Sequence, residues 1–127
     1  MKKVLIVDDS SSARMFIRRC VEIAGLRGAE FTEAGNGQEA LDILRASGAD
    51  LVLTDLTMPT MDGETLLKRM KASPALNEIP VVVISSASNP SKEKALLEQG
   101  AAAVVKKPPT PASLAQIIQN MWKESER

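Results

Sequence analysis

The 127-residue chain contains no histidine, no tyrosine and a single cysteine, and its other aromatic residues are two phenylalanines and one tryptophan. Without histidine, the most common general base of enzymes is absent. So few aromatic rings also argue against a flavin carrier, which sandwiches its cofactor between flat side chains. Cys20 has no partner for an internal disulfide, and we expect a buried core thiol because free cysteines are among the most buried residues.

The balance of charge and the shortness of the apolar runs argue against further classes of protein, those that bind nucleic acid or membranes. Lysine plus arginine and aspartate plus glutamate both number 16, so the formal net charge is zero and no overall field favours nucleic acid or an anionic membrane. The apolar stretch after Lys2 and Lys3 ends at Val7, too short for a signal sequence, and no segment reaches membrane-spanning length. We therefore expect a cytoplasmic monomer with one domain over residues 1–127. The initial Met1 and the charged tail at 123–127 suggest a complete chain.

Strand-like and helix-like segments alternate along the chain. Strands are expected at residues 3–7, 29–33, 50–54, 80–85 and 102–106, and helices at 11–24, 38–47 and 63–72, with two more that begin at Asn89 and Thr110. The fourth helix has few apolar residues, so we expect it to be loosely held. Strict alternation with short connections predicts an α/β fold: a doubly wound, open, parallel five-stranded sheet between layers of five helices.

Acidic residues end two of the most apolar predicted strands. Val7 leads into Asp8 and Asp9, and Thr54 leads into Asp55. Buried carboxylates are costly and neighbouring carboxylates repel one another, so this pattern calls for a divalent cation. In a doubly wound sheet the ligand site lies beyond the carboxyl ends of the strands. The polar residues expected at that edge are Asp8, Asp9, Asp55, Ser85 and Lys107.

Each of these residues also has an ordinary structural interpretation. Asp9 or Ser10 is a suitable cap for the first helix, and Asp55 is a common turn residue. Ser85 fits a hydroxyl bonded to nearby backbone at a strand end, and a lone lysine such as Lys107 is usually solvated. No single residue decides between a structural and a chemical role.

Taken together, the three carboxylates, the hydroxyl and the ammonium supply the parts of a phosphoryl-transfer site. Mg²⁺ prefers a few carboxylate oxygens with water and phosphate, so Asp9 and Asp55 are expected to bind it directly and Asp8 through water. A carboxylate attacks phosphorus without prior deprotonation, and we assign Asp55 as the nucleophile because the other two are adjacent and better placed to share a metal. Lys107 and Ser85 would stabilise the transferred charge.

These residues resemble the response-regulator receiver domain of two-component signalling, particularly the stand-alone, CheY-like kind with a flavodoxin-like three-layer αβα fold. The matching motifs are Val7-Asp8-Asp9-Ser10, Asp55-Leu56-Thr57-Met58-Pro59 with Met61-Asp62-Gly63, residues 80–85, and Gly100-Ala101 leading to Lys107-Pro108. They cover nearly the whole chain in the expected order.

The resemblance implies a role for each matching residue. Asp55 would accept a phosphoryl group from a histidine kinase or phosphotransfer protein, and Asp9, Asp55 and the backbone carbonyl of Thr57 would hold Mg²⁺ with help from Asp8 through water. The signal would pass to an unknown protein target, as in chemotaxis-like regulators. Such a domain is a signalling phosphoacceptor with self-phosphorylation and autodephosphorylation chemistry only. A cis peptide before Pro108 would aim Lys107 at the site; the neighbouring Lys106 should face the opposite way.

Two positions depart from the family pattern. Val104 stands where an aromatic residue often reports phosphorylation by rotating, and valine cannot make that swing. Pro109 follows the Lys107-Pro108 pair where an aromatic residue is frequent, and it stiffens the approach to the last helix. The remaining half of such a switch is Ser85, which phosphorylation would draw inward, shifting the loop before the fourth helix.

Other interpretations stay open. The chain could be a phosphorelay intermediate, the receiver part of a longer regulator, or a binding module that has lost the chemistry. A small aspartyl-phosphate phosphatase of the haloacid dehalogenase kind would want an aspartate where Thr57 stands. A flavodoxin should have a hydroxyl-rich phosphate loop. Arg14, Arg18 and Arg19 give the first helix a basic face, which is either ordinary solvated surface or a kinase contact.

Overall fold

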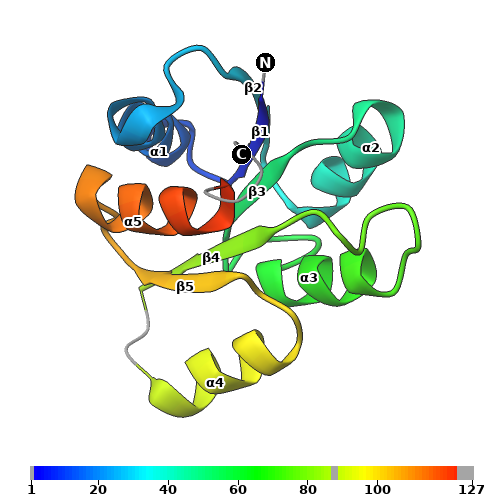
Figure 1. The fold of residues 1–127 in the computed structure, drawn as a ribbon. Coiled ribbons are helices and arrows are strands. Elements are labelled where there is room, and N and C mark those ends of the chain that lie inside the picture. Colours follow the sequence, from blue (N-terminus) through cyan, green and yellow to red (C-terminus); the bar gives the residue numbers. More distant parts are fainter. Residues whose placement is uncertain (1, 87–88, 123–127) are drawn as a thin grey trace.

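The computed structural model describes residues 2–86 and 89–122, so the charged tail at 123–127 lies outside the described part. Five strands form one parallel sheet in the order β2-β1-β3-β4-β5 (Figure 1). The strands are β1 (Lys3–Val7), β2 (Glu30–Ala34), β3 (Leu51–Asp55), β4 (Val81–Ser85) and β5 (Ala103–Lys106). The helices are α1 (Ser11–Val21), α2 (Gly37–Ser47), α3 (Gly63–Lys71), α4 (Pro90–Glu98) and α5 (Pro111–Trp122). The predicted doubly wound α/β architecture is confirmed.

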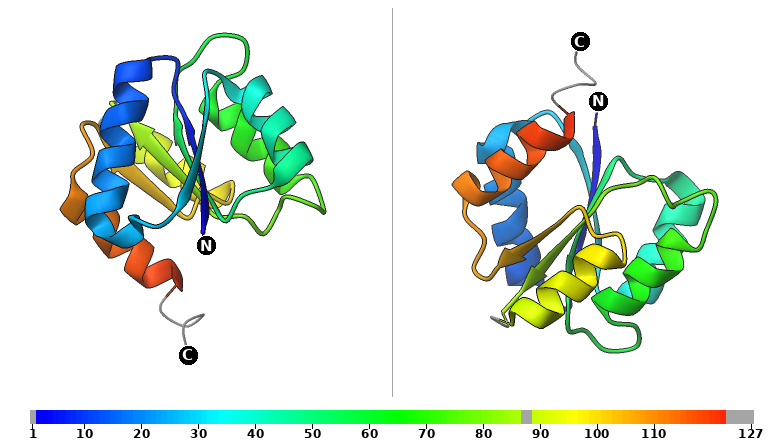
Figure 2. Two further views of the ribbon diagram at one scale, coloured as in Figure 1. Left: turned by 90° about the horizontal axis from the view of Figure 1, so that it is seen from above. Right: turned by 60° about the horizontal axis from the view of Figure 1, so that its bottom comes forward.

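The three central strands consist almost entirely of apolar residues because helices cover both of their faces. Every residue of β3 and β4 is buried, and so is every residue of β1 after Lys3. The helices α1 and α5 lie on one face of the sheet, and α2, α3 and α4 lie on the other (Figure 2). Two separate apolar clusters fill the space between the sheet and these layers.

Short polar side chains cap the starts of four of the described helices. Ser10, Asn36, Asp62 and Asn89 each accept a hydrogen bond from a backbone amide in the first turn of α1, α2, α3 and α4. Glycine ends α2, where Gly48 has a φ of 71° that few other residues adopt. Among the described residues, no helix combines the length and apolar character that crossing a bilayer requires.

Two details of the first helical segment differ from the sequence prediction. The regular helix ends at Val21 and continues as one π-helical turn, Glu22–Leu26, in which Gly25 has a φ of 129°. Ile17 and Cys20 are buried as expected, but Phe16 is 49% exposed. Successive helical residues point about 100° apart, so α5 covers the stripe through Ile17 and Cys20 and leaves Phe16 at its edge.

The fourth helix is attached by one buried side chain and by polar contacts to α3. Leu96 is its only buried residue, whereas Leu97 is 45% exposed. On α3, the Glu64 carboxylate pairs with the Lys92 ammonium and also accepts a hydrogen bond of 3.0 Å from the Gln99 amide. The position of α4 therefore depends on Glu64 as well as on the apolar packing of Leu96.

Candidate functional site

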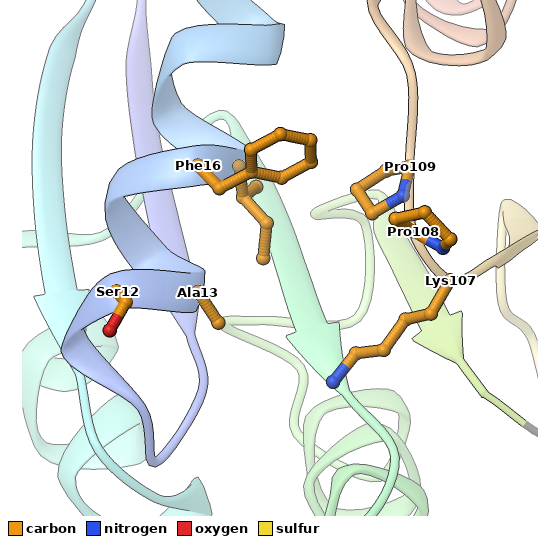
Figure 3. A pocket seen from close by; sticks show the side chains of 7 residues that line it. Ser12, Ala13, Phe16, Lys107, Pro108 and Pro109 are labelled. Atoms are coloured by element: carbon orange, nitrogen blue, oxygen red, sulfur yellow. The ribbon is translucent and has the colours of Figure 1, made fainter.

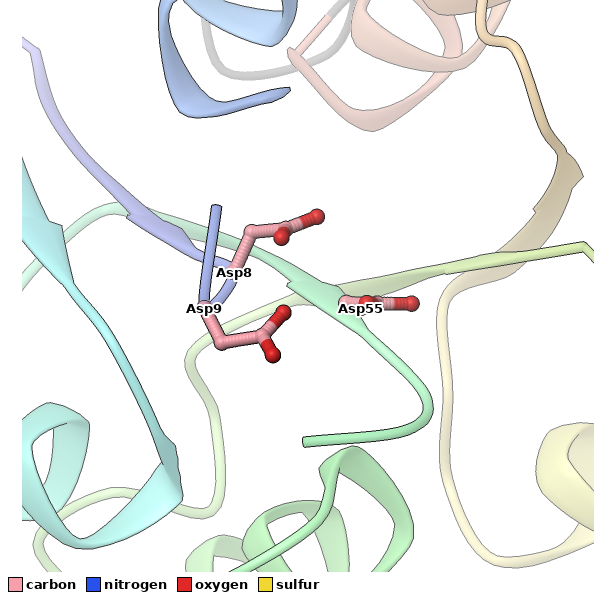
Figure 4. A group of neighbouring side chains, drawn as sticks. All are labelled: Asp8, Asp9 and Asp55. Carbon is pink, nitrogen blue, oxygen red and sulfur yellow. The ribbon is translucent and has the colours of Figure 1, made fainter. Parts of the chain in front are cut away.

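Three carboxylates meet at the carboxyl ends of the adjacent strands β1 and β3 (Figure 4). One oxygen from each of Asp8, Asp9 and Asp55 lies within 4.8 Å of the others. Asp8 and Asp55 are buried, and Asp9 is exposed. The chain leaves β1 toward β2 on one side and returns to β3 on the other, so the cluster occupies the point where strand order reverses.

Asp55 is the last residue of β3, and both of its carboxylate oxygens have donors. Oδ1 accepts a hydrogen bond of 2.8 Å from the Leu56 amide, and Oδ2 lies 3.1 Å from the Lys107 ammonium. The Leu56 carbonyl in turn accepts a bond of 2.8 Å from the Gly63 amide, which anchors the loop after β3 to the start of α3. The carboxylate is thus held in one orientation with its charge partly balanced.

Asp8 is fixed by its own backbone and by the turn that follows it. Its amide donates to the Ala34 carbonyl at 3.0 Å, and its Oδ1 accepts from the Ser10 amide at 2.9 Å. Ser10 also caps α1, because its hydroxyl oxygen accepts from the Ala13 amide at 3.2 Å. Ser10 therefore fills the capping role that the sequence left open between Asp9 and Ser10, and Asp9 is available to the cluster.

Lys107 connects the buried carboxylates across the site. It follows β5, its peptide bond to Pro108 is cis, and its ammonium lies 3.1 Å from Asp55 Oδ2 and 3.4 Å from Asp8 Oδ2. Burial by itself lowers the pKa of Lys107, but the hydrogen bond to Asp55 and the charges of Asp55 and Asp8 outweigh burial and raise that pKa above its ordinary value. Lys106 is exposed, so Lys107 is the lysine that reaches the carboxylates.

Ser85 and Thr57 take the positions expected from the strand ends. Ser85 is the buried last residue of β4, and its carbonyl accepts a hydrogen bond of 2.9 Å from the Lys107 amide. In the sheet register, its neighbour Ile84 lies opposite Asp55. Thr57 lies two residues beyond Asp55 in the loop before α3, with its side chain exposed. All five polar residues of the predicted edge, Asp8, Asp9, Asp55, Ser85 and Lys107, therefore end at the same side of the sheet.

The donor set suits a small, hard divalent cation. Three carboxylates within reach of one point provide the oxygen ligands that Mg²⁺ prefers, and the exposure of Asp9 leaves room for water and a further oxygen. The part of the chain that can be described contains no other group of three such acidic, histidine or cysteine ligands.

An apolar hollow opens beside the cluster, between α1 and the loop that joins β5 to α5 (Figure 3). Phe16, Pro108 and Pro109 line it, and the Lys107 side chain runs from its wall toward the carboxylates. Met15, next to Phe16 on α1, is 73% exposed. The sequence predicted neither the hollow nor an outward Phe16, since both depend on how the loop after Lys107 meets α1.

Sequence reasoning also missed the contacts that Arg14 makes beside the site. It treated Arg14 as part of an exposed basic face, whereas Arg14 is half-buried and bonded to the Asp8 carbonyl and to Glu33. Arg18 and Arg19 are exposed as expected, with the Arg18 guanidinium 4.7 Å from the centre of the Phe31 ring. One feature of the sequence could have indicated this contact. Arg14 lies four residues after the capping Ser10, and residues four apart lie on the same face of a helix.

A model of the response regulator receiver domain matches residues 4–119. The chain belongs to this family. Receiver domains are signalling domains of two-component systems, so this receiver is not a conventional enzyme. The predicted family and the CheY-like fold are both confirmed.

Individual relatives agree with this assignment. The receiver is 38% identical over 121 residues to the two-component response regulator ORR7 of Oryza sativa subsp. japonica, covering 93% of this chain and 55% of that protein. It is 37% identical over 119 residues to ORR3 of Oryza sativa subsp. indica, covering 93% of this chain and 88% of that protein. The chain thus spans about half the length of ORR7 and most of ORR3.

A solved structure has the same fold. The chemotaxis response regulator CheY4 of Vibrio cholerae superposes with a TM-score of 0.82 at 29% sequence identity, covering 94% of this chain and 98% of that chain.

Proposed function

We propose that this receiver accepts a phosphoryl group on Asp55 from the phosphohistidine of a histidine kinase or phosphotransfer protein, in a reaction that requires Mg²⁺. The observation that carries the proposal is the surroundings of Asp55. Its carboxylate lies 3.1 Å from the Lys107 ammonium and shares a cluster of oxygens within 4.8 Å with Asp8 and Asp9. The site therefore combines a nucleophile, a cation-binding group and a fixed positive charge in one place.

In the proposed transfer, a carboxylate oxygen of Asp55 attacks the phosphorus atom while the bond from phosphorus to the donor's imidazole nitrogen breaks. The electron pair of that bond stays on the imidazole, and Asp55 carries an acyl phosphate. Bound Mg²⁺ would supply positive charge to the phosphoryl oxygens. Asp8, Asp9, Asp55 and the Thr57 carbonyl would hold it. No proton has to leave Asp55 before attack, which suits a chain without histidine.

Fixed donors at the site would stabilise the transferred group. The Lys107 ammonium, already between Asp8 and Asp55, would move its contact to a phosphoryl oxygen, and the Ser85 hydroxyl would donate to another. The Leu56 amide holds Asp55 Oδ1 at 2.8 Å and so limits rotation of the carboxylate. Positioning and electrostatics would provide most of the rate increase, as in phosphoryl transfer generally.

We further propose that phosphorylation changes the surface formed by α4, β5 and α5, which an unidentified protein target binds. Ser85 ends β4 immediately before the segment that leads to α4, and α4 is held by one buried side chain and by Glu64. A shift of Ser85 toward the phosphoryl group would therefore move a weakly packed helix. Val104 is half-buried against the core beneath α4, where it packs but cannot swing outward as an aromatic ring does.

The apolar hollow beside Lys107 is the proposed docking place of the phosphohistidine donor. It adjoins Asp55 through Lys107 and is lined by the half-exposed Phe16, whose neighbour on α1, Met15, is 73% exposed. Apolar residues that stay exposed beside a reactive group indicate a contact surface for a partner. The donor proposed here is a protein that inserts its phosphohistidine between α1 and the loop after β5.

The remaining parts of the proposal are a monomeric, cytoplasmic receiver with a single domain over residues 1–127. A role as a phosphorelay intermediate differs only in what happens to the phosphoryl group afterwards, because Asp55 would then pass it to a second histidine. A phosphatase role is disfavoured by Thr57, which stands where that family places an acidic residue.

The deciding experiment is incubation with Mg²⁺ and acetyl phosphate, followed by intact-mass measurement. We expect the wild type to gain one phosphoryl group, Asp55→Asn to gain none, and Asp42→Asn, a change at an exposed aspartate on α2, to behave as the wild type. An unmodified wild type, or equal gain by Asp55→Asn, would overturn the proposal. Turnover of a phosphate monoester by the wild type would favour the phosphatase.

A further inference from the structure

Arg14 connects three elements around the acidic cluster. It lies on α1, its Nε donates to Glu33 Oε1 on β2 at 2.7 Å, and its Nη1 donates to the backbone carbonyl of Asp8 after β1 at 2.6 Å. Its side chain is only 19% exposed. Both bonds are short and involve a charged donor, so they are stronger than ordinary neutral hydrogen bonds.

The carbonyl that Arg14 binds belongs to the peptide group joining Asp8 to Asp9. Because the peptide group is planar, fixing its oxygen also fixes where the nitrogen and Cα of the next residue lie. No described residue donates a hydrogen bond to the Asp9 carboxylate or forms an ion pair with it. Restraint on the position of Asp9 therefore comes through its backbone, which Arg14 holds at the Asp8 carbonyl while the Asp8 carboxylate holds the Ser10 amide on the other side of Asp9.

The charge of Arg14 would by itself oppose cation binding, because a guanidinium bonded to the Asp8 carbonyl, next to the acidic cluster, repels a metal ion. Glu33 offsets this effect by pairing with the Nε atom of Arg14, while Nη1 bonds the Asp8 carbonyl. The pair thus supplies two geometric restraints while adding little net charge. Arg14 and Glu33 would therefore favour metal binding by fixing the orientation of the ligands, and not by attracting the cation.

We propose that Arg14 is a positioning residue for Mg²⁺: by bonding the Asp8 carbonyl while anchored on Glu33, it orients Asp9 to bind the cation together with Asp8 and Asp55. This inference rests on the proposed Mg²⁺ dependence of the site. Residues that orient metal ligands commonly change affinity by about 10-fold to 100-fold when they are replaced.

The charge of Arg14 and its positioning role predict opposite changes in Mg²⁺ affinity when Arg14 is replaced, so one measurement distinguishes them. If Arg14 acted only through its charge, Arg14→Gln would strengthen Mg²⁺ binding. If Arg14 positions Asp9, Arg14→Gln weakens binding by about tenfold. Arg14→Lys keeps the charge but has a single ammonium that does not match both acceptors, so it is expected to restore little of the affinity. Glu33→Gln should give a smaller loss, because the anchor loses its charge but keeps an oxygen.

The measurement is direct titration of each purified full-length variant with Mg²⁺ by calorimetry, with thermal unfolding followed in parallel. Arg19→Gln, an exposed arginine on the same helix, is the matched control and should bind Mg²⁺ as the wild type does. With acetyl phosphate, Arg14→Gln should need about tenfold more Mg²⁺ for half-maximal phosphorylation and reach nearly the wild-type rate at saturation.

Three outcomes would overturn the inference: unchanged or tighter Mg²⁺ binding by Arg14→Gln, an equal loss in Arg19→Gln, or a lowered melting temperature without any change in affinity. If Arg14→Gln does not fold, Arg14→Lys and Glu33→Gln test the same contacts. A wild type that binds no Mg²⁺ refutes the proposed function itself, which separates that failure from a failure of the role of Arg14.

Discussion

The backbone of Gly63, at the start of α3, lies against the backbone of Asp55. A methyl group at Gly63 would lie 2.1 Å from the Asp55 carbonyl oxygen, and the Gly63 amide donates to the Leu56 carbonyl at 2.8 Å. Only glycine permits this approach, because any side chain would have to push β3 and α3 apart. The backbone of Asp55, the proposed phosphoryl acceptor, thus packs directly against the backbone of Gly63.

Gly63→Ala should therefore displace Asp55 as well as destabilise the fold. Forcing a methyl group into packed backbone costs about 1 to 3 kcal/mol of unfolding free energy, measured by urea denaturation. The rate of phosphorylation by acetyl phosphate should also fall. Gly28→Ala is the control, since nothing lies within 4 Å of a methyl group there. Equal stability and equal rates for Gly63→Ala and Gly28→Ala would show that the contact does not constrain Asp55.

Replacing Lys107 should affect metal and phosphoryl binding in opposite directions. The ammonium lies 3.1 Å from Asp55 Oδ2 and 3.4 Å from Asp8 Oδ2, so Lys107→Ala removes a charge that competes with Mg²⁺ and should tighten Mg²⁺ binding several-fold. The same change removes a donor to the transferred group, so affinity for the phosphoryl mimic beryllofluoride should fall. Calorimetry measures both affinities. Lys106→Ala should change neither, and parallel changes in both affinities for Lys107→Ala would contradict its proposed role.

Acid should loosen the attachment of α4. The hydrogen bond from Lys92, followed by that from Gln99, lowers the pKa of Glu64 below its usual value of 4.5. A carboxylate with a depressed pKa stabilises the folded state above its unfolded pKa, and that contribution is lost as pH falls through the folded value. Amide exchange in α4 should therefore accelerate, relative to the other helices, as pH drops below about 4.5.

The variant Glu64→Gln isolates that contact at neutral pH. It should raise exchange in α4 at pH 7 and remove the extra acid sensitivity. Glu98→Gln, at an exposed position on α4 itself, should do neither. If α4 exchanges at the same rate in the wild type and in Glu64→Gln, the helix is held by its packing alone.

A polar substitution in the hollow should slow phosphoryl transfer from a protein donor but not from a small-molecule donor. Phe16→Ser removes an exposed ring from the proposed docking surface without touching the carboxylates. Transfer from a phosphohistidine protein should slow about tenfold or more, as expected for loss of a contact worth over 1.4 kcal/mol, whereas the rate with acetyl phosphate should stay unchanged. Leu97→Ser changes an exposed apolar residue on α4 and serves as the control. Equal slowing with both donors would place the effect in the reaction site and not in docking.

Much of this molecule follows from local patterns. Continuous apolar runs predicted β1, β3 and β4. Helical apolar spacing, with cap residues at Asn89 and Thr110, predicted where the helices begin, within a few residues of the observed bounds. Because parallel strands align their carboxyl ends, the order of polar residues along the chain was enough to predict that Asp8, Asp55 and Ser85 lie at one edge of the sheet. The edge strand β2 begins and ends one residue later than predicted, at Glu30–Ala34 and not 29–33. The buried β3 does the same, at Leu51–Asp55 and not 50–54, because an apolar pattern marks the interior of a strand better than its ends.

The sequence alone determined the class of the fold and the kinds of groups at the site, since burial and strand order depend on patterns that repeat along the chain. The tertiary structure decided which groups touch. Arg14 bonds the Asp8 carbonyl and Glu33, Gly63 packs on Asp55, and Phe16 borders a hollow. These contacts join segments that are distant in sequence or depend on rotations of about 100° between successive helical residues. Their geometry exists only once the sheet and its two helical layers have packed together.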